Sequence, residues 1–86
     1  MSTKVLMVCL GNICRSPLAE GIMRHLTQGS EYEIDSAGTA NYHAGAAPDP
    51  RSIEVAAQNG IDISQQQARQ LTAQDIFDFD HILVMD

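Results

Sequence analysis

One stretch decides the fold of this 86-residue chain: Val8-Cys9-Leu10-Gly11-Asn12-Ile13-Cys14-Arg15-Ser16-Pro17. The residues before it, 4–8, form a nearly continuous apolar run, which is typical of a strand buried in a parallel sheet. Pro17 suits the first position of a helix. A short loop therefore joins a strand to a helix, and its amides and the positive end of the helix predict a site for a small tetrahedral anion.

Two further elements follow this loop. A helix is predicted to span Pro17 to Gln28, where apolar residues recur at helical spacing and Gly29 gives a stop signal. A short strand comes next, over residues 32–36. It leads into a flexible loop over residues 37–41, which we expect to form a rim of the anion site.

A second helix is predicted over residues 48–59, with Asp49 as its cap and Gly60 as its stop. Residues 64–70 are polar and rich in glutamine, without apolar periodicity, and are interpreted as a surface connection. The second helix is expected to bury a face of small and apolar residues: Ile53, Val55, Ala56 and Ala57.

A short third helix is predicted after Thr72, which is placed to form a capping box with Asp75, while Leu71 and Ile76 form a hydrophobic staple. The run over residues 81–85 is again continuously apolar and typical of a buried parallel strand.

This alternation of strands and helices predicts an α/β fold: an open parallel sheet with helices on both faces and a phosphate-binding loop after the first strand. The last strand would leave an apolar edge uncovered, so we expect the domain to be incomplete at its C-terminus. Residues 1–86 are accordingly interpreted as the N-terminal portion of a single domain.

Composition and charge limit the possible functions. The formal net charge of −6 and the scatter of only five Lys and Arg residues argue against nucleic-acid binding. The chain has no apolar run long enough to span a membrane, and its N-terminus lacks the features of a signal peptide. Two cysteines in one loop are best interpreted as thiols in a reducing compartment, which predicts a cytoplasmic protein.

The loop combines a nucleophile with an anion clamp. Cys9 at a helix N-terminus, beside Arg15 and Ser16, is expected to have a depressed pKa and to react as a thiolate. The loop amides and the planar guanidinium would hold the oxygens of a phosphate above the sulfur, so that attack gives a cysteinyl-phosphate. This chemistry requires no metal and no organic cofactor. The alternative interpretation is a buried Cys9 with a merely solvated Arg15.

The same stretch resembles the signature of the low-molecular-weight protein tyrosine phosphatases, and the resemblance covers essentially the whole chain. The resemblance makes Cys9 the nucleophile and Arg15 the phosphate clamp. It also implies that the phosphate-binding loop consists of Leu10, Gly11, Asn12, Ile13, Cys14, Arg15 and Ser16. Further matching segments are Asp35-Ser36-Ala37-Gly38-Thr39, Pro48-Asp49-Pro50-Arg51, Leu71-Thr72 with Asp75, and Phe79-Asp80-His81-Ile82-Leu83-Val84-Met85-Asp86.

The resemblance also implies supporting roles. Asn12 and Ser36 would brace the loop, Ser16 would assist the thiolate, and Tyr42 would wall the entrance for an aromatic substrate. Cys14 has two open interpretations of equal weight. It either forms a reversible disulfide with the nucleophile under oxidation or simply packs against its neighbours.

The general acid of the family is an aspartate in a C-terminal loop of the Asp-Pro-Tyr type, which has no match in these residues. The Asp49-Pro50 pair is followed by Arg51 and matches an earlier helix-opening segment, so Asp49 is interpreted as a cap. Without a proton donor for the leaving oxygen, the 86-residue chain is expected to lose about 100- to 10,000-fold in rate.

These features predict a phosphatase of phosphotyrosine in proteins, with a phosphotyrosine-containing protein such as a tyrosine kinase as partner and inorganic phosphate or a similar oxyanion as a ligand. Two alternatives remain open: an arsenate reductase of the same fold, which would need further resolving cysteines, and a non-catalytic phosphate-binding module. The histidines and the remaining acidic residues form no metal pattern and suit surface, capping or turn positions: His25, His43, His81, Asp75, Asp78 and Asp80.

Overall fold

The computed structural model describes residues 2–85. Met1 and the final Asp86 of the last matching segment lie outside the described residues. The elements, in chain order, are β1 (Thr3–Cys9), α1 (Arg15–Leu26), β2 (Tyr32–Gly38), α2 (Pro50–Gln58), α3 (Ala73–Asp78) and β3 (His81–Val84). No helix among residues 2–85 is long and apolar enough to cross a membrane.

The strands form one parallel sheet in the order β2-β1-β3, which confirms the predicted α/β fold. β1 lies in the centre, and its Leu6 and Val8 are fully buried. A central strand is covered on both faces, which explains why its sequence is apolar without alternation. At its carboxyl end, Cys9 pairs with Gly38 of β2.

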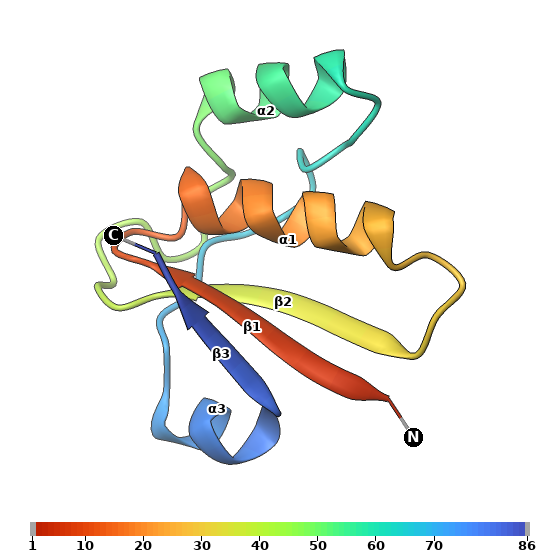
Figure 1. Cartoon of the computed structure of the whole chain (residues 1–86). Coiled ribbons are helices and arrows are strands. Elements are labelled where there is room, and N and C mark those ends of the chain that lie inside the picture. Colours follow the sequence, from red (N-terminus) through yellow and green to blue (C-terminus); the bar gives the residue numbers. More distant parts are fainter. Residues whose placement is uncertain (1, 86) are drawn as a thin grey trace.

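Helices cover both faces of the sheet, as predicted (Figure 1). On one face α1 packs over a cluster that contains Val5, Met7 and Ile34. On the other face, where α3 lies, the segment around Leu71 and Phe79 packs over Leu6, Val8 and Ala37. α2 lies outside α1 as a third layer.

The apolar face expected of α2 is buried only in part, because α2 packs on a helix and not on the sheet. Ser52 and Ala56 are its buried residues, whereas Val55 and Ala57 are exposed and Ile53 is half-buried. Small residues let two helices approach closely, so the contact needs little apolar area. Its ends follow the prediction, with Asp49 accepting a hydrogen bond from the Arg51 backbone and Gly60 at a φ of 75°.

The predicted boundaries of α1 and β2 differ from the structure. α1 begins at Arg15 and ends at Leu26, two residues before the predicted limits at each end. β2 continues to Gly38, so Ala37 is a fully buried strand residue and the loop begins only at Thr39. The strand is longer because Ala37 fills the core and Gly38 pairs with Cys9, contacts that a local pattern does not show.

Residues 64–70 are not the surface connection that their polarity predicts. Ala68 is buried, and its N–H donates to the Ala46 carbonyl at 2.8 Å. The Gly38 N–H donates to the Arg69 carbonyl at 2.8 Å, and Gln70 forms a bridge with Gly38. Backbone pairing holds this segment, and such pairing leaves no apolar period in the sequence.

The predicted capping box of α3 is confirmed, since Thr72 and Asp75 exchange side-chain and backbone hydrogen bonds. The predicted staple is wrong: Leu71 packs on the Leu6 cluster, and Ile76 is exposed. The expected burial of the last strand is also wrong for the described residues, because Val84 on β3 is 66% exposed. β3 pairs on one side only, at the edge of the sheet, as the expected open edge requires.

Candidate active site

Cys9 ends β1 with its side chain buried, and residues 10–14 lead from it to the first turn of α1. Asn12 has a φ of 56°, a left-handed conformation that the asparagine side chain tolerates better than most. The backbone N–H groups of Gly11, Asn12 and Ser16 lie close enough to the Cys9 sulfur to lower its pKa. The loop therefore curls around the sulfur and directs its donors toward it, as a nest for an anion does.

The loop is held from outside by β2 and the segment after it. The N–H groups of Thr39 and Ala40 donate to the carbonyls of Cys9 and Leu10 at 3.0 and 2.9 Å. Gly38 lies so close that a Cβ there would stand 2.8 Å from the Leu10 carbonyl oxygen and 3.1 Å from the Asn12 nitrogen. These neighbours are backbone atoms, so the loop itself would have to move.

We therefore expect Gly38→Ala to destabilise the protein by about 1–3 kcal/mol through overpacking and to weaken phosphate binding. Denaturant unfolding and calorimetric titration with inorganic phosphate measure the two effects. Gly29→Ala is the control for phosphate binding: a Cβ at Gly29 meets nothing within 4 Å, but alanine is strained at its φ of 80°, so this variant loses stability away from the loop. Equal losses of phosphate affinity in the two variants would show that the close approach at Gly38 has no special role.

The pKa of Cys9 lies below that of an ordinary thiol. Burial is the largest single influence and raises the pKa. The Ser16 hydroxyl, 3.0 Å from the sulfur, and the N–H groups of Ser16, Asn12 and Gly11 lower it and together outweigh burial. The direction agrees with the expectation from the sequence, but the main causes are these hydrogen bonds rather than Arg15.

Ser16→Ala should raise the pKa of Cys9, since it removes a hydrogen bond to the charged sulfur. Such a bond contributes about 1.5–3 kcal/mol, so the thiolate fraction below the pKa should fall about tenfold or more. The rate of Cys9 alkylation by iodoacetamide across pH measures this fraction. A pH profile that matches the parent protein would contradict the assignment of Ser16 as donor.

A buried hydrogen-bond network joins the loop to β2. The Asn12 side-chain amide donates to the hydroxyls of Ser16 at 2.7 Å and Ser36 at 2.9 Å. The Ser36 hydroxyl donates to the Glu20 carboxylate at 2.6 Å. The structure thus brings together Asn12 and Ser36, the residues of the predicted brace, and connects them to Ser16 and Glu20.

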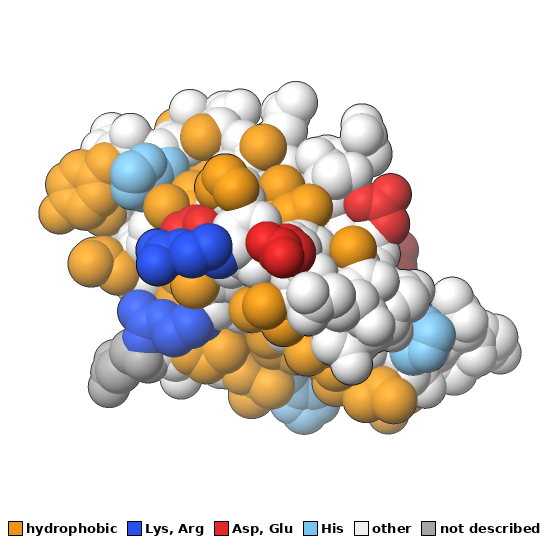
Figure 2. All heavy atoms as spheres, turned by 90° about the horizontal axis from the view of Figure 1, so that it is seen from above, with side chains coloured by type: hydrophobic (Ala, Val, Ile, Leu, Met, Phe, Trp, Pro, Cys, Tyr) orange, Lys and Arg blue, Asp and Glu red, His pale blue; other side chains and the backbone are white. Residues whose placement is uncertain are grey.

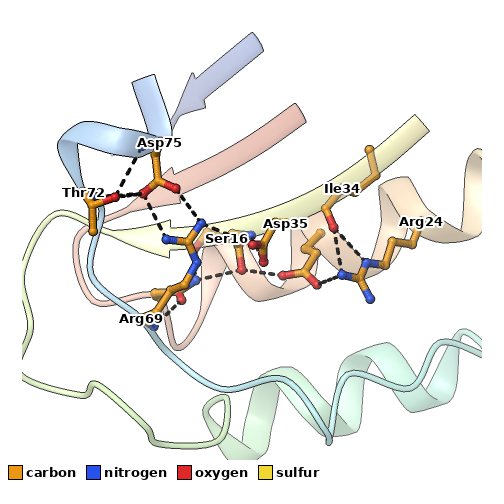
Figure 3. Close-up of polar contacts among 10 residues, drawn as sticks. Ser16, Arg24, Ile34, Asp35, Arg69, Thr72 and Asp75 are labelled. Carbon is orange, nitrogen blue, oxygen red and sulfur yellow. Dashed lines mark hydrogen bonds and ion pairs between the residues drawn. The ribbon is translucent and has the colours of Figure 1, made fainter. Parts of the chain in front are cut away.

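Arg69 is a second residue that the sequence did not indicate. Its N–H donates to the Asn12 side-chain oxygen at 3.0 Å. Its guanidinium lies between Asp75 of α3, with two contacts of 3.0 Å, and Asp35 of β2 at 3.2 Å (Figure 3). Only the scarcity of basic residues, five Lys and Arg against eleven Asp and Glu, could have drawn attention to it.

A cavity of about 300 Å³ opens above the nucleophile. Its lining residues are Cys9, Leu10, Arg15, Thr39, Val84 and Met85, so Cys9 and Arg15 share one cavity. None of these described residues is a carboxylate. Asp49 lies elsewhere as the α2 cap, and the Arg51 backbone N–H lowers its pKa, which suits a cap rather than an acid.

The other predicted residues are placed as follows. Tyr42 does not line this cavity; it is 74% exposed and contacts the His43 ring edge-on at 6.1 Å. His43 lies against Gly11, 3.0 Å from the position of a Cβ there, so a histidine expected at the surface touches the loop.

Cys14 is exposed rather than packed and accepts a hydrogen bond from Ser52 at 3.3 Å. Both cysteines are free thiols.

The electrostatic field at the site is local. On the face in Figure 2, basic side chains form one small group next to acidic ones, and no broad basic patch is visible. Among residues 2–85, no group of three or more His, Cys, Asp or Glu could hold a metal ion. The anion-binding capacity therefore rests on the loop N–H groups, the start of α1 and Arg15.

Comparisons with known proteins agree with this geometry. The family model described as "Low molecular weight phosphotyrosine protein phosphatase" matches residues 4–86. The protein of that name from Schizosaccharomyces pombe is 47% identical, over 96% of this chain and 56% of its own length. The chain thus spans about half the length of the curated relatives it matches.

Solved structures show the same relationship. The crystal structure of YfkJ from Bacillus subtilis is 43% identical and has a TM-score of 0.95, covering 100% of this chain and 57% of that one. The structure titled DARP, drosophila arginine phosphatase, is 39% identical with a TM-score of 0.92, covering 98% of this chain and 55% of that one.

Proposed function

The chain belongs to the low-molecular-weight phosphotyrosine protein phosphatase family, and on this premise we propose that the protein hydrolyses phosphotyrosine in proteins. One observation carries the proposal: the Cys9 sulfur, with its lowered pKa, faces the loop N–H groups and shares a cavity with Arg15. A reactive thiolate inside an oxyanion cradle is the arrangement that phosphoryl transfer to sulfur requires.

In the proposed reaction, the Cys9 thiolate attacks phosphorus in line, so that an S–P bond forms as the bond to the tyrosine oxygen breaks. The loop from Leu10 to Ser16 binds the non-bridging oxygens, and the Arg15 guanidinium takes two of them as a planar fork. Water then cleaves the cysteinyl-phosphate, releasing inorganic phosphate and restoring the thiolate. Ser36 supports the loop through Asn12.

The proton for the leaving oxygen must come from elsewhere. No carboxylate lines the Cys9 cavity among residues 2–85, and the relatives are almost twice as long as this chain. We infer that residues 1–86 supply the nucleophile half of a single domain and that a segment outside them supplies the acid. Tyr42 is not among the residues that line the Cys9 cavity, so its role at the entrance for an aromatic substrate stays a prediction.

Trapping tests the function directly. The intact protein is mixed with a ³²P-labelled phosphotyrosyl peptide, quenched in acid and digested, and the label is located by mass spectrometry. We expect label on Cys9 and release of tyrosyl peptide. No labelled enzyme despite phosphate binding would favour a phosphate-binding module, and thiol-dependent turnover of arsenate would favour an arsenate reductase.

A phosphoarginine peptide belongs in the same experiment, because one similar structure is titled an arginine phosphatase. Faster labelling by phosphotyrosine than by phosphoarginine supports the proposed substrate, and the reverse order overturns it. A tyrosine kinase as the partner also stays a prediction. We also propose that the protein works in a reducing compartment such as the cytoplasm, because the proposed nucleophile Cys9 reacts only as a reduced thiolate.

A further inference from the structure

The strongest unassigned feature is the buried carboxylate of Glu20 on α1, which is 3% exposed. It accepts a hydrogen bond from the Ser36 hydroxyl at 2.6 Å and pairs with the Arg24 guanidinium at 2.9 Å. Burial raises its pKa, while Ser36 and Arg24 act in the opposite direction and Asp35 adds to the rise. A buried acid is rare in proteins unless it is paired or has a task.

Glu20 lies between a second cavity and the hydrogen bonds that lead to Cys9. It lines a second cavity of about 440 Å³, together with Arg24, His25, Asp35 and Gln66 among others. From Glu20 the hydrogen bonds continue through Ser36 and Asn12 to Ser16, whose hydroxyl lies 3.0 Å from the Cys9 sulfur. This series of hydrogen bonds is short and buried. Its one side branch among the described residues is the Arg69 N–H, which donates to Asn12.

The direction of these hydrogen bonds follows from their ends. An ionised carboxylate can only accept, so Ser36 donates its proton to Glu20 and offers its oxygen to Asn12. The Asn12 amide then donates one N–H to Ser36 and the other to Ser16, while its oxygen accepts from Arg69. Ser16 is left with its proton directed to Cys9, and a thiolate can only accept it.

We propose that Glu20 is a positioning residue for the nucleophile: by accepting from Ser36, it orients Asn12 and thereby the Ser16 hydroxyl that stabilises the Cys9 thiolate. The inference rests on the proposed function only in taking Cys9 as the nucleophile. Without this acceptor, the buried Ser36 hydroxyl donates its proton to the side-chain oxygen of Asn12 instead. The Asn12 amide then rotates and no longer donates to Ser16. Glu20 touches neither phosphate nor the reacting sulfur.

The test compares Glu20→Met with Glu20→Gln in a Cys14→Ser background of the intact protein. Both variants remove the charge and leave Arg24 with the Ile34 carbonyl but without its carboxylate partner. Only glutamine keeps an oxygen that can accept from Ser36. Iodoacetamide alkylation of Cys9 is followed across pH. We expect Glu20→Met to alkylate about 3- to 10-fold more slowly than Glu20→Gln at neutral pH, with its profile moved to higher pH.

Ser36→Ala locates the effect. In that background Glu20→Met and Glu20→Gln should have the same profile, because the intermediate hydroxyl is gone. Identical profiles of the two variants with Ser36 present, or a difference that persists with Ser36→Ala, would overturn the proposal. If Glu20→Met does not fold, Glu20→Ala replaces it. An alkylation profile of Glu20→Ala equal to that of Glu20→Gln would then overturn the proposal.

Alkylation needs no phosphatase turnover, so this test and the trapping experiment can fail separately. A Glu20 effect on Cys9 without a cysteinyl-phosphate would support the positioning role and overturn the proposed function. A cysteinyl-phosphate with no effect of Glu20 on Cys9 would support the proposed function and overturn the positioning role. A loss of thermal stability without a change in the Cys9 profile would show a merely structural role and overturn the proposal.

Discussion

Cys9→Ser is expected to abolish phosphoryl transfer, with a loss of at least about 10,000-fold in the rate of phosphate release from an aryl phosphate. Ser16 and the loop N–H groups lower the pKa of Cys9 and so favour its thiolate, which is accessible because an ordinary thiol already ionises at a pKa of about 8.5. A serine hydroxyl does not, and none of the described residues lining the cavity is a base that could take its proton.

The same variant should still bind inorganic phosphate. The loop N–H groups and Arg15 are unchanged, and oxygen is smaller than sulfur, so calorimetric titration should give an affinity close to that of the parent. Cys14→Ser is the matched control within the loop: it keeps the backbone N–H, and the side chain that it changes is exposed and contacts Ser52 rather than the sulfur of Cys9. Substantial turnover by Cys9→Ser, or an equal loss in Cys14→Ser, would remove Cys9 from its proposed role.

The sequence predicted most reliably what depends on neighbouring residues. The apolar run of β1, the loop with Gly11, and the caps at Asp49 and Thr72 are each specified within a few positions, and the structure reproduces them. Signals of this kind act through local backbone conformation and hydrogen bonding, so they need no knowledge of the rest of the fold. The positions of Cys9 at the end of a strand and Arg15 near the start of a helix were predicted for the same reason.

What the sequence could not predict depends on contacts between distant segments. Arg69 reaches Asn12 across 57 positions, and it does so through a backbone N–H that any residue type would supply. Glu20 resembles any helical glutamate in the sequence, and only the fold places it against Ser36. The exposure of Val84 has another cause: its apolar character fits a covered strand, but no described element lies beyond β3.

Arg15→Lys should reduce kcat/KM by about 100-fold or more, the loss typical of removing one donor from an oxyanion site. The guanidinium presents two parallel N–H groups to two phosphate oxygens, whereas an ammonium is a point charge that fixes one. Charge is conserved in this change, so the loss measures geometry. Arg15→Met, which keeps length but not charge, should lose more, and inorganic phosphate should bind both variants more weakly.

Stability provides the control for this pair. Arg15 is exposed on the first turn of α1, and such substitutions usually change the free energy of unfolding by no more than about 0.5 kcal/mol. Lost activity in a variant of unchanged melting temperature therefore reflects phosphate contacts. Suppose that Arg15→Lys kept its kcat/KM while Arg15→Met lost it. The positive charge alone would then account for the role of Arg15, and the N–H groups around Cys9 would have to fix the phosphate geometry.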